Sequence, residues 1–170
     1  PGATNFITSP AGTNSLIFSE IASVLDPTFF IELQNSSAND VSTSGWGLST
    51  SLGQSISLPT VTVAPGGYVT FSAAELGLTP VDGLRLVLTA ANGSVFRDAR
   101  SITKSLRGLT SSGLWGHPSA PSSGSTNTFT VSNAIVINEI FYQGLGTSTE
   151  QWVELYNRSA NPVDLFGWKF

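Results

Sequence analysis

The sequence predicts an all-β protein built as a β-sandwich, and three observations lead to this fold class. Charged residues make up only 11% of the 170 residues, less than half the usual share near 25%. Residues 16–102 hold about seven short runs rich in β-branched and aromatic residues, with turn residues between them. The same strand-turn-strand pattern also occurs twice along the chain. Short strands at this spacing are typical of a sandwich.

The predicted strands follow one another from Leu16 to Ile102. In chain order the runs are LIFSEIAS, FFIELQN, GWGLST, SISL, TVTVAPGGYVTFSA, LRLVLTA and SVFRDARSI. The APGG at residues 64–67 predicts a turn inside the fifth run, because Pro presets φ and Gly supplies a positive φ. The Asn-Gly at residues 92–93 predicts a hairpin between the last two runs. The AAELGL around Glu75 suggests one helical turn.

An internal repeat appears when the chain is aligned with itself. A shift of 122 positions aligns FIELQNSSANDVSTSGWGL (residues 30–48) with WVELYNRSANPVDLFGWKF (residues 152–170) without a gap. Nine of these nineteen positions are identical, where background residue usage gives about one. Upstream, LIFSEIA (residues 16–22) matches IVINEIF (residues 135–141) at a shift of 119. The duplication is therefore real, and the difference in shift falls between strands, where insertions are tolerated.

The repeat divides the chain into four predicted segments. Residues 1–14 read as the end of a preceding repeat or a linker, because GATNF resembles GSTNTF at residues 124–129. Residues 15–103 form a complete sandwich. Residues 104–133, rich in Ser, Gly and Pro without periodicity, are predicted to be a linker. Residues 134–170 hold the first strands of a second sandwich. Because the sequence has no Met, we expect a fragment or a processed product.

The second copy, IVINEIFYQ followed by EQWVELYNRSANPVDLFGWKF, resembles the opening of a lamin tail domain. The first strand ends in Asn-Glu-Ile, the second carries Glu-Leu-Tyr-Asn, and the third opens on Gly-Trp. In the first copy VAPGGYVTF resembles a later turn of the family, and PSSGSTN resembles a Pro-Gly-x-x-Asn segment that closes bacterial copies. The first copy departs from the pattern at Ser19, Gln34 and Ser44.

This resemblance implies an immunoglobulin-like β-sandwich of the bacterial secreted, tandem type. It implies a non-enzymatic structural or interaction module of a larger exported protein, secreted or at the cell surface. Such a module spaces or docks other domains of the same protein or protein partners. The alternative is a glycan- or calcium-binding module that uses carboxylates and aromatics of the first two strands, with polysaccharide as the partner.

Composition excludes several classes of function. With no Cys, thiol catalysis, cysteine-ligated zinc and disulfides are excluded. A net charge of −4 without a basic run argues against nucleic-acid binding. No apolar run is long enough to span a membrane. The one histidine, His117, lies in the predicted linker, and no Gly-x-Ser-x-Gly elbow is present. We therefore expect no enzyme and no obligatory cofactor.

Two carboxylates in each copy are the candidate metal ligands. If the first two strands form a hairpin that turns near Asp26, Glu20 and Glu32 face each other, and Glu139 and Glu154 do the same around Gly146. Opposed like charges destabilise a sheet, and a Ca²⁺ ion between them would remove this cost. Asp26 or Glu150 could supply a further ligand. Alternatively the register is offset, or Arg side chains or backbone N–H groups satisfy the carboxylates. Catalysis by such a pair, as in glycoside hydrolysis, has no other support in the sequence.

Aromatic side chains of the second copy are the candidate ligand-binding residues. Trp152, Glu154 and Tyr156 share one face of a predicted strand, opposite Val153 and Leu155. They could stack on a sugar or a partner, or other strands could cover them. Asn35, Asn92 and Asn157 each lie in an Asn-x-Ser glycosylation sequon. For Asn35 and Asn157 we expect a different role, in which the side chain caps the turn after the second strand.

The apolar strands of residues 135–170 also lack a sheet to pack on. Small strand sets are marginal unless one face is buried, and open edges pair with other chains. We therefore expect residues 135–170 to dock on the first domain or to exchange strands with a neighbouring molecule.

Overall fold

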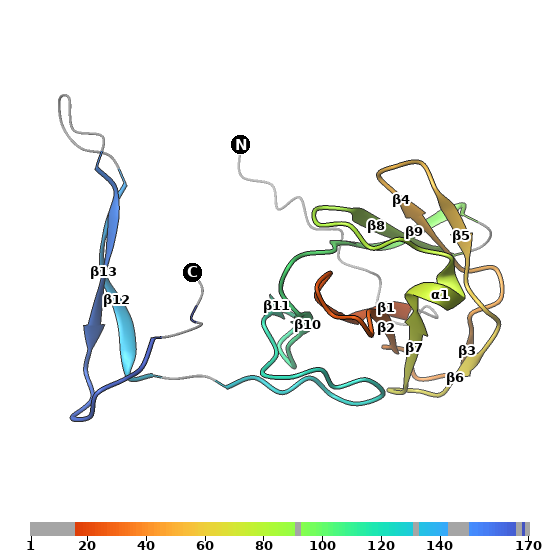
Figure 1. Ribbon diagram of the computed structural model, residues 1–170. Coiled ribbons are helices and arrows are strands. Elements are labelled where there is room, and N and C mark those ends of the chain that lie inside the picture. Colours follow the sequence, from red (N-terminus) through yellow and green to blue (C-terminus); the bar gives the residue numbers. More distant parts are fainter. Residues whose placement is uncertain (1–15, 91–92, 131–132, 143–149, 166–167, 169–170) are drawn as a thin grey trace, which may run out of the picture. The chain divides into compact units, whose positions relative to one another are not determined.

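The computed structural model describes residues 16–90, 93–130, 133–142, 150–165 and 168. The described residues form an all-β protein with several antiparallel sheets and one short helix, as the sequence predicts (Figure 1). The chain divides into two compact units, residues 1–129 and residues 130–170. No helix among the described residues is long and apolar enough to cross a membrane.

The first unit is a sandwich of two main sheets. One is five-stranded in the order β11-β10-β1-β2-β7, and the other is four-stranded in the order β5-β4-β8-β9. A small pair, β3 with β6, lies beside them. The strands of this unit are β1 (Leu16–Ile21), β2 (Phe30–Asn35), β3 (Val41–Ser42), β4 (Gly47–Thr50), β5 (Ser55–Ser57), β6 (Thr62–Val63), β7 (Tyr68–Ser72), β8 (Arg85–Ala90), β9 (Val95–Ser101), β10 (Arg107–Leu109) and β11 (Trp115–Gly116).

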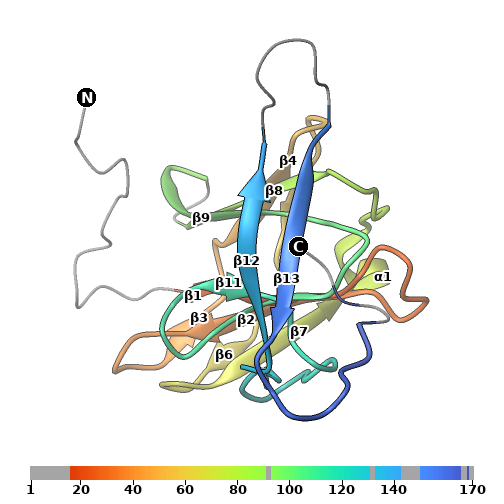
Figure 2. The same ribbon diagram turned by 90° about the vertical axis from the view of Figure 1, so that its left-hand side faces the viewer.

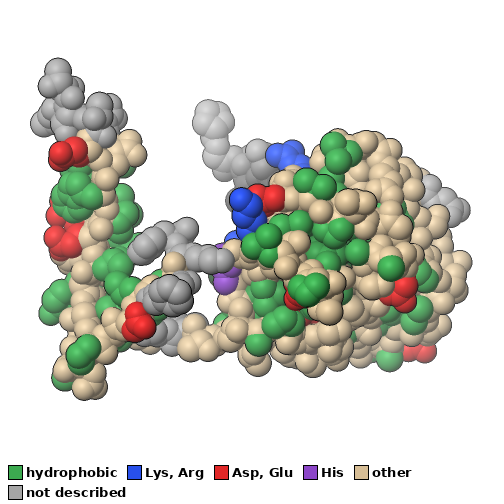
Figure 3. Space-filling model, in the orientation of Figure 1, with side chains coloured by type: hydrophobic (Ala, Val, Ile, Leu, Met, Phe, Trp, Pro, Cys, Tyr) green, Lys and Arg blue, Asp and Glu red, His purple; other side chains and the backbone are tan. Residues whose placement is uncertain are grey.

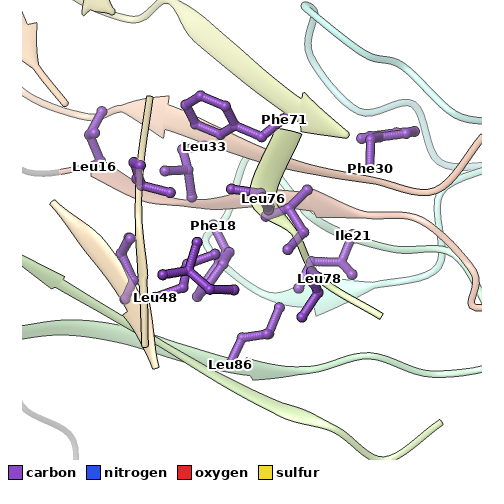
Figure 4. Packing of buried hydrophobic residues seen from close by; sticks show 14 of the residues in the cluster. Leu16, Phe18, Ile21, Phe30, Leu33, Leu48, Phe71, Leu76, Leu78 and Leu86 are labelled. Atoms are coloured by element: carbon purple, nitrogen blue, oxygen red, sulfur yellow. The ribbon is translucent and has the colours of Figure 1, made fainter. Parts of the chain in front are cut away.

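A single core fills the space between the two sheets. Phe18 and Leu33 of one sheet and Leu48, Leu86 and Leu88 of the other are at most 1% exposed. Figure 4 shows these layers meeting, with labelled side chains from both sheets pointing toward one another. Burial of such apolar surface is the main force that holds the two sheets together.

A β-bulge in β1 decides which side chains enter the core. The register between β1 and β2 shifts between Phe18 and Glu20, so that Phe18 pairs with Leu33 and Glu20 pairs with Glu32. In an unbroken strand Phe18 and Glu20 would share one face. The extra residue of the bulge, Ser19, lets Phe18 and Ile21 both face the core while Glu20 faces away from it. The bulge therefore places the carboxylate pair on the outer face of the five-stranded sheet.

The predicted turns and the helical turn are confirmed where the structure describes them. Gly67 N–H donates to Ala64 O at 2.9 Å, and Gly66 has φ 70°, as a Pro-Gly turn requires. The helix α1 (Ala73–Leu76) begins with a capping box, in which Ser72 and Glu75 exchange hydrogen bonds. Of the predicted β8–β9 hairpin loop, residues 91–92 lie outside the described residues, and Gly93 has φ 88°.

The structure differs from the sequence-based prediction in the segment assigned to a linker. Within residues 104–133, β10 pairs with β1 and β11 pairs with β10, and the first unit extends to residue 129. These strands are only two and three residues long, which is too short for a period-2 pattern to show in the sequence. The predicted linker therefore supplies part of the five-stranded sheet.

The second unit is a hairpin of β12 (Ile135–Phe141) and β13 (Trp152–Asn157) (Figure 2). Its register repeats that of β1 and β2, with Ile137 opposite Leu155 and Glu139 opposite Glu154, and with the same shift between them. The bulge residue is Asn138 in place of Ser19. The third predicted strand of this copy lies largely outside the described residues.

Candidate functional site

The first carboxylate pair lies on the outer face of the five-stranded sheet. Glu20 and Glu32 are directly opposed across β1 and β2, as predicted, and both are 0% exposed. The same row continues to Gly108 on β10 and to Thr70 on β7. Two buried carboxylates face to face need donors or a cation to offset desolvation and repulsion.

The donors come from residues 118–128, which we call the strap. The strap is a loop whose ends are joined by a hydrogen bond from Ser119 N–H to Thr128 O at 2.8 Å. Its tip is a turn closed by Ser125 N–H to Ser122 O at 2.9 Å, with Gly124 at φ 81°. A glycine at this position supplies the left-handed backbone that points the tip N–H groups in one direction. In Figure 1 the strap is the teal segment that follows β11.

The tip of the strap donates hydrogen bonds to both carboxylates. Ser122 N–H lies 3.2 and 3.1 Å from Glu20 Oε1 and Oε2, and its hydroxyl donates to Oε2 at 2.9 Å. Gly124 N–H donates to Glu32 Oε2 at 2.5 Å. The hydroxyl of Thr70 adds a longer bond to the same oxygen at 3.3 Å. Charge-assisted bonds of this kind are stronger than neutral ones, so the carboxylate pair holds the strap against the sheet.

Asn127 fastens the other end of the strap to the bulge. Its side-chain amide donates to Ser19 O at 3.0 Å and to Leu109 O at 3.3 Å, and its oxygen accepts from the Ser122 hydroxyl at 3.1 Å. Asn127 is only 8% exposed. On β7, the Tyr68 and Thr70 hydroxyls bond Thr126 and Ser123 of the strap at 3.2 and 2.8 Å. The strap therefore crosses β10, β1, β2 and β7 along the carboxylate row.

Burial raises the pKa of both glutamates. For Glu20 the bonds from Ser122 oppose this rise. For Glu32 the bond from Gly124 and the Ser19 and Thr70 hydroxyls oppose it, while the charge of Glu20 raises its pKa further. The pair thus retains protons to a higher pH in the folded protein than in the unfolded chain.

One oxygen of the first pair is left over. Glu32 Oε1 is buried and has no hydrogen-bond partner among the described residues. The Ser19 hydroxyl lowers the pKa of the Glu32 carboxyl, although it makes no hydrogen bond of ordinary geometry to Oε1.

A Ca²⁺ site needs several oxygen ligands, and the groups that face this pair are chiefly N–H and O–H donors. Among the described residues, no three His, Asp or Glu side chains lie close enough together to hold a metal ion. Asp26, a predicted further ligand, accepts bonds from Thr28 at 2.8 and 2.7 Å instead, and Glu150 is exposed. Donors of the strap thus contact the oxygens of this pair, and Ca²⁺ binding by Glu20 and Glu32 stays a prediction.

The second carboxylate pair is open. Glu139 and Glu154 are opposed across β12 and β13, as predicted, and both are exposed. The side chain of the bulge residue Asn138 donates to Glu154 Oε1. The structure therefore brings together both pairs that the sequence suggested, one covered and one uncovered.

The predicted aromatic residues lie on the same face as the second pair. Trp152 stacks on Phe141, with ring centroids 5.5 Å apart and planes 15° apart, and Tyr156 pairs with Val136 on the far side of the carboxylates. Trp152 is 41% exposed and Tyr156 is 57% exposed. Figure 3 shows hydrophobic and acidic side chains gathered together on β12 and β13. This face combines aromatic surface with negative charge.

The duplicated asparagines cap a turn in both copies, as predicted. Asn35 donates to Asn39 O at 2.7 Å and accepts from Ser37 N–H at 2.9 Å. Asn157 donates to Asn161 O at 2.8 Å and accepts from Ser159 N–H at 2.9 Å. The identities in the repeat therefore preserve a hydrogen-bonded turn.

The four-stranded sheet of the first unit has a hollow of its own. A hollow of about 420 Å³ on the four-stranded sheet is lined by Trp46, Leu48, Ile56, Leu58, Thr89 and neighbouring Gly, Ser and Thr residues, with no acid or base. His117 lies 2.9 Å from Arg107 Nη1.

The strap was missed by sequence reasoning. Its signals in the sequence are the likeness between GSTNTF and GATNF near the start of the chain and the likeness of PSSGSTN to a Pro-Gly-x-x-Asn segment. A scan against protein-family models found no match, and searches of curated proteins and of solved structures found none either. The resemblance to lamin tail domains therefore rests on the quoted residues alone.

Proposed function

We propose that the chain is a non-catalytic structural and interaction module, made of lamin-tail-like, immunoglobulin-like sandwiches in tandem. Its role is to space or dock other domains of a larger, exported bacterial protein at or beyond the cell surface. The family, the localisation and the tandem array are part of this proposal. They follow from the motifs NEI, ELYN and GW and from the repeat.

The observation that carries the proposal is the state of the first carboxylate pair. A binding module would present an open carboxylate or aromatic cluster in both copies, whereas a spacer would bury or pair it. Glu20 and Glu32 are 0% exposed and hold the strap of the same chain. The two carboxylates thus accept hydrogen bonds that fix the strap on the sandwich, which supports a structural role.

The experiment that tests the proposal is thermal unfolding of the chain in EDTA and in millimolar Ca²⁺. We expect equal midpoints, because donors of the strap take the positions that a cation would occupy at Glu20 and Glu32. A ligand at 100 times its dissociation constant adds about 2.7 kcal/mol, a shift of several degrees. Such a shift, abolished in Glu20→Gln/Glu32→Gln, would overturn the structural role of this pair.

A second candidate function is glycan or calcium binding by the second copy. It is favoured by the exposure of Trp152 and Tyr156 beside Glu139 and Glu154, because aromatic rings stack on sugars. Titration of the chain with soluble oligosaccharides, followed by ¹⁵N chemical shifts, tests it. Saturable shifts confined to residues 135–157 would support this function over a purely structural one.

A further inference from the structure

We propose that the carboxylate face of β12–β13 is a docking surface for a strap-like peptide. The face consists of Val136, Glu139, Phe141, Trp152, Glu154 and Tyr156. The occupant is an uncharged loop with the spacing Ser-Ser-Gly-Ser-Thr-Asn, whose tip offers two N–H groups to the two carboxylates. This inference rests on the proposed interaction role and names its partner class.

The two hairpins are equivalent in the register of their strands and in the turn that follows. Both have a glutamate pair directly after a one-residue shift of register, Glu20 with Glu32 and Glu139 with Glu154. The turn that follows each second strand is held by the same Asn and Ser bonds. The backbone geometry that presents the carboxylates is therefore the same in both.

The first hairpin shows what such a pair binds. The strap covers the first pair and donates one backbone N–H to each glutamate, from Ser122 and from Gly124. The Asn127 amide then reaches the bulge carbonyl of Ser19 at 3.0 Å. Backbone groups make most of these contacts, so recognition depends on the shape of the tip and on one asparagine.

The second hairpin exposes the same acceptors. Glu139 and Glu154 are exposed, and Trp152 and Tyr156 replace the Phe30 and Gln34 of the first copy. The larger rings on both sides of the carboxylates offer apolar surface to the flanks of a loop. A peptide that docks here would cover aromatic surface and satisfy both carboxylates together.

The test uses the full chain and a synthetic peptide of residues 117–129, HPSAPSSGSTNTF. We expect saturable ¹⁵N–¹H shift changes at residues 135–141 and 152–157, with the first unit unchanged because its own strap fills its site. Binding should be at least tenfold weaker for the chain variant Glu139→Gln/Glu154→Gln, since it loses two charge-assisted bonds. The matched control Asp40→Asn/Asp82→Asn removes the same charge from the first unit and should bind as the parent does.

The peptide itself supplies the second control. Peptides with Asn127→Ala or Gly124→Ala should bind at least tenfold more weakly, because one lacks the bulge contact and the other cannot form the tip at φ 81°. Absence of a saturable shift, equal binding of a scrambled peptide, or unchanged binding by Glu139→Gln/Glu154→Gln would each overturn the proposal. Shifts produced by xylohexaose and not by the peptide would assign the face to sugars and overturn it too. None of these outcomes alters the Ca²⁺ test of Glu20 and Glu32. A failure of the docking proposal can therefore be told apart from a failure of the proposed structural function.

Discussion

At the residue scale, Glu32 makes the stability of the first unit depend on pH in an unusual direction. Its folded-state pKa lies above the ordinary value of 4.5, chiefly because of burial. The folded state therefore binds the proton more tightly than the unfolded chain does. Stability from this group is fully present below the unfolded pKa and is lost as the pH rises through the folded pKa.

Glu32→Gln should remove this dependence. Gln keeps an acceptor for Gly124 N–H but cannot ionise. We expect the midpoint of Glu32→Gln relative to the parent to rise as the pH increases from 4 to 8, measured by thermal unfolding across a pH series.

The matched control is Glu75→Gln at the cap of α1. Bonds from Ser72 lower the pKa of Glu75, so its stabilisation is present above pH 4.5 and lost in acid. The thermal midpoint of Glu75→Gln relative to the parent should therefore fall as the pH increases, which is the opposite of the trend expected for Glu32→Gln. Equal slopes for the two variants would contradict the assignment of Glu32.

Asn35 and Asn157 give a second prediction at this scale, because the same turn occurs in two environments. Asn35 is 0% exposed and also donates to Val63 O at 2.8 Å, which ties β2 to β6. Asn157 is exposed. We expect Asn35→Ala to cost about 1–3 kcal/mol, since it leaves buried backbone groups unpaired, in urea unfolding followed by circular dichroism. Asn157→Ala should change this transition by less than about 0.5 kcal/mol, and a similar loss in both would argue against the burial-based difference.

At the element scale, the strap depends on the absence of a side chain at Gly108. A Cβ there would lie 2.5 Å from Asn127 Oδ1 and 2.6 Å from Pro118 Cγ. We expect Gly108→Ala to destabilise the first unit by about 1–3 kcal/mol, the usual cost of overpacking. Hydrogen exchange at the amides of Ser122 and Gly124 should become faster, because the strap is displaced from the carboxylates.

Gly116→Ala is the control for this variant. Its Cβ would lie 3.0 Å from the Phe129 ring, which is a side chain that can move. A smaller loss of stability and unchanged exchange at Ser122 and Gly124 are expected. If Gly108→Ala left these amides protected, the strap would not depend on this close approach.

The elements that could be predicted from the sequence are those with hydrophobic alternation. The strands β1, β2, β4, β5 and β7 to β9 follow the predicted runs, and the opposition of both glutamate pairs followed from hairpin symmetry. The bulge has a trace in the sequence, since apolar Phe18 and Ile21 lie three apart and both enter the core.

The strap, β10 and β11 could not be predicted in the same way. Their contacts join backbone groups to Ser, Gly and Asn, which leave no periodic apolar pattern. The sequence left open whether backbone N–H groups satisfy the carboxylates, and it did not show that the first pair would be buried and the second open.

At the scale of the whole molecule, the second unit exposes an apolar face. Ile137, Ile140 and Val153 are 55%, 58% and 44% exposed, whereas the equivalent Phe18, Ile21 and Ile31 are 0% exposed in the first unit. Exposed apolar strands promote association with other chains. The sequence-based expectation of docking or strand exchange through residues 135–170 therefore remains a prediction.

We expect the 170-residue chain to associate with rising concentration in analytical ultracentrifugation. Ile140→Lys/Val153→Lys should shift it toward monomer, because charges on this face oppose its burial. Leu52→Lys, at a position of the first unit that is 76% exposed, should leave association unchanged. A parent chain that stays monomeric at all concentrations would contradict the prediction.

The distance along the chain between the glutamates and their cover has a consequence for folding. Ser122 lies 102 residues beyond Glu20, so this contact closes a long loop and belongs among the late steps of folding. A nascent chain that has emerged only as far as β9 would hold both acids open to water. We expect Asn127→Ala to speed unfolding with little effect on the refolding rate. The strap would then bind to a sandwich that has already formed and would slow its unfolding.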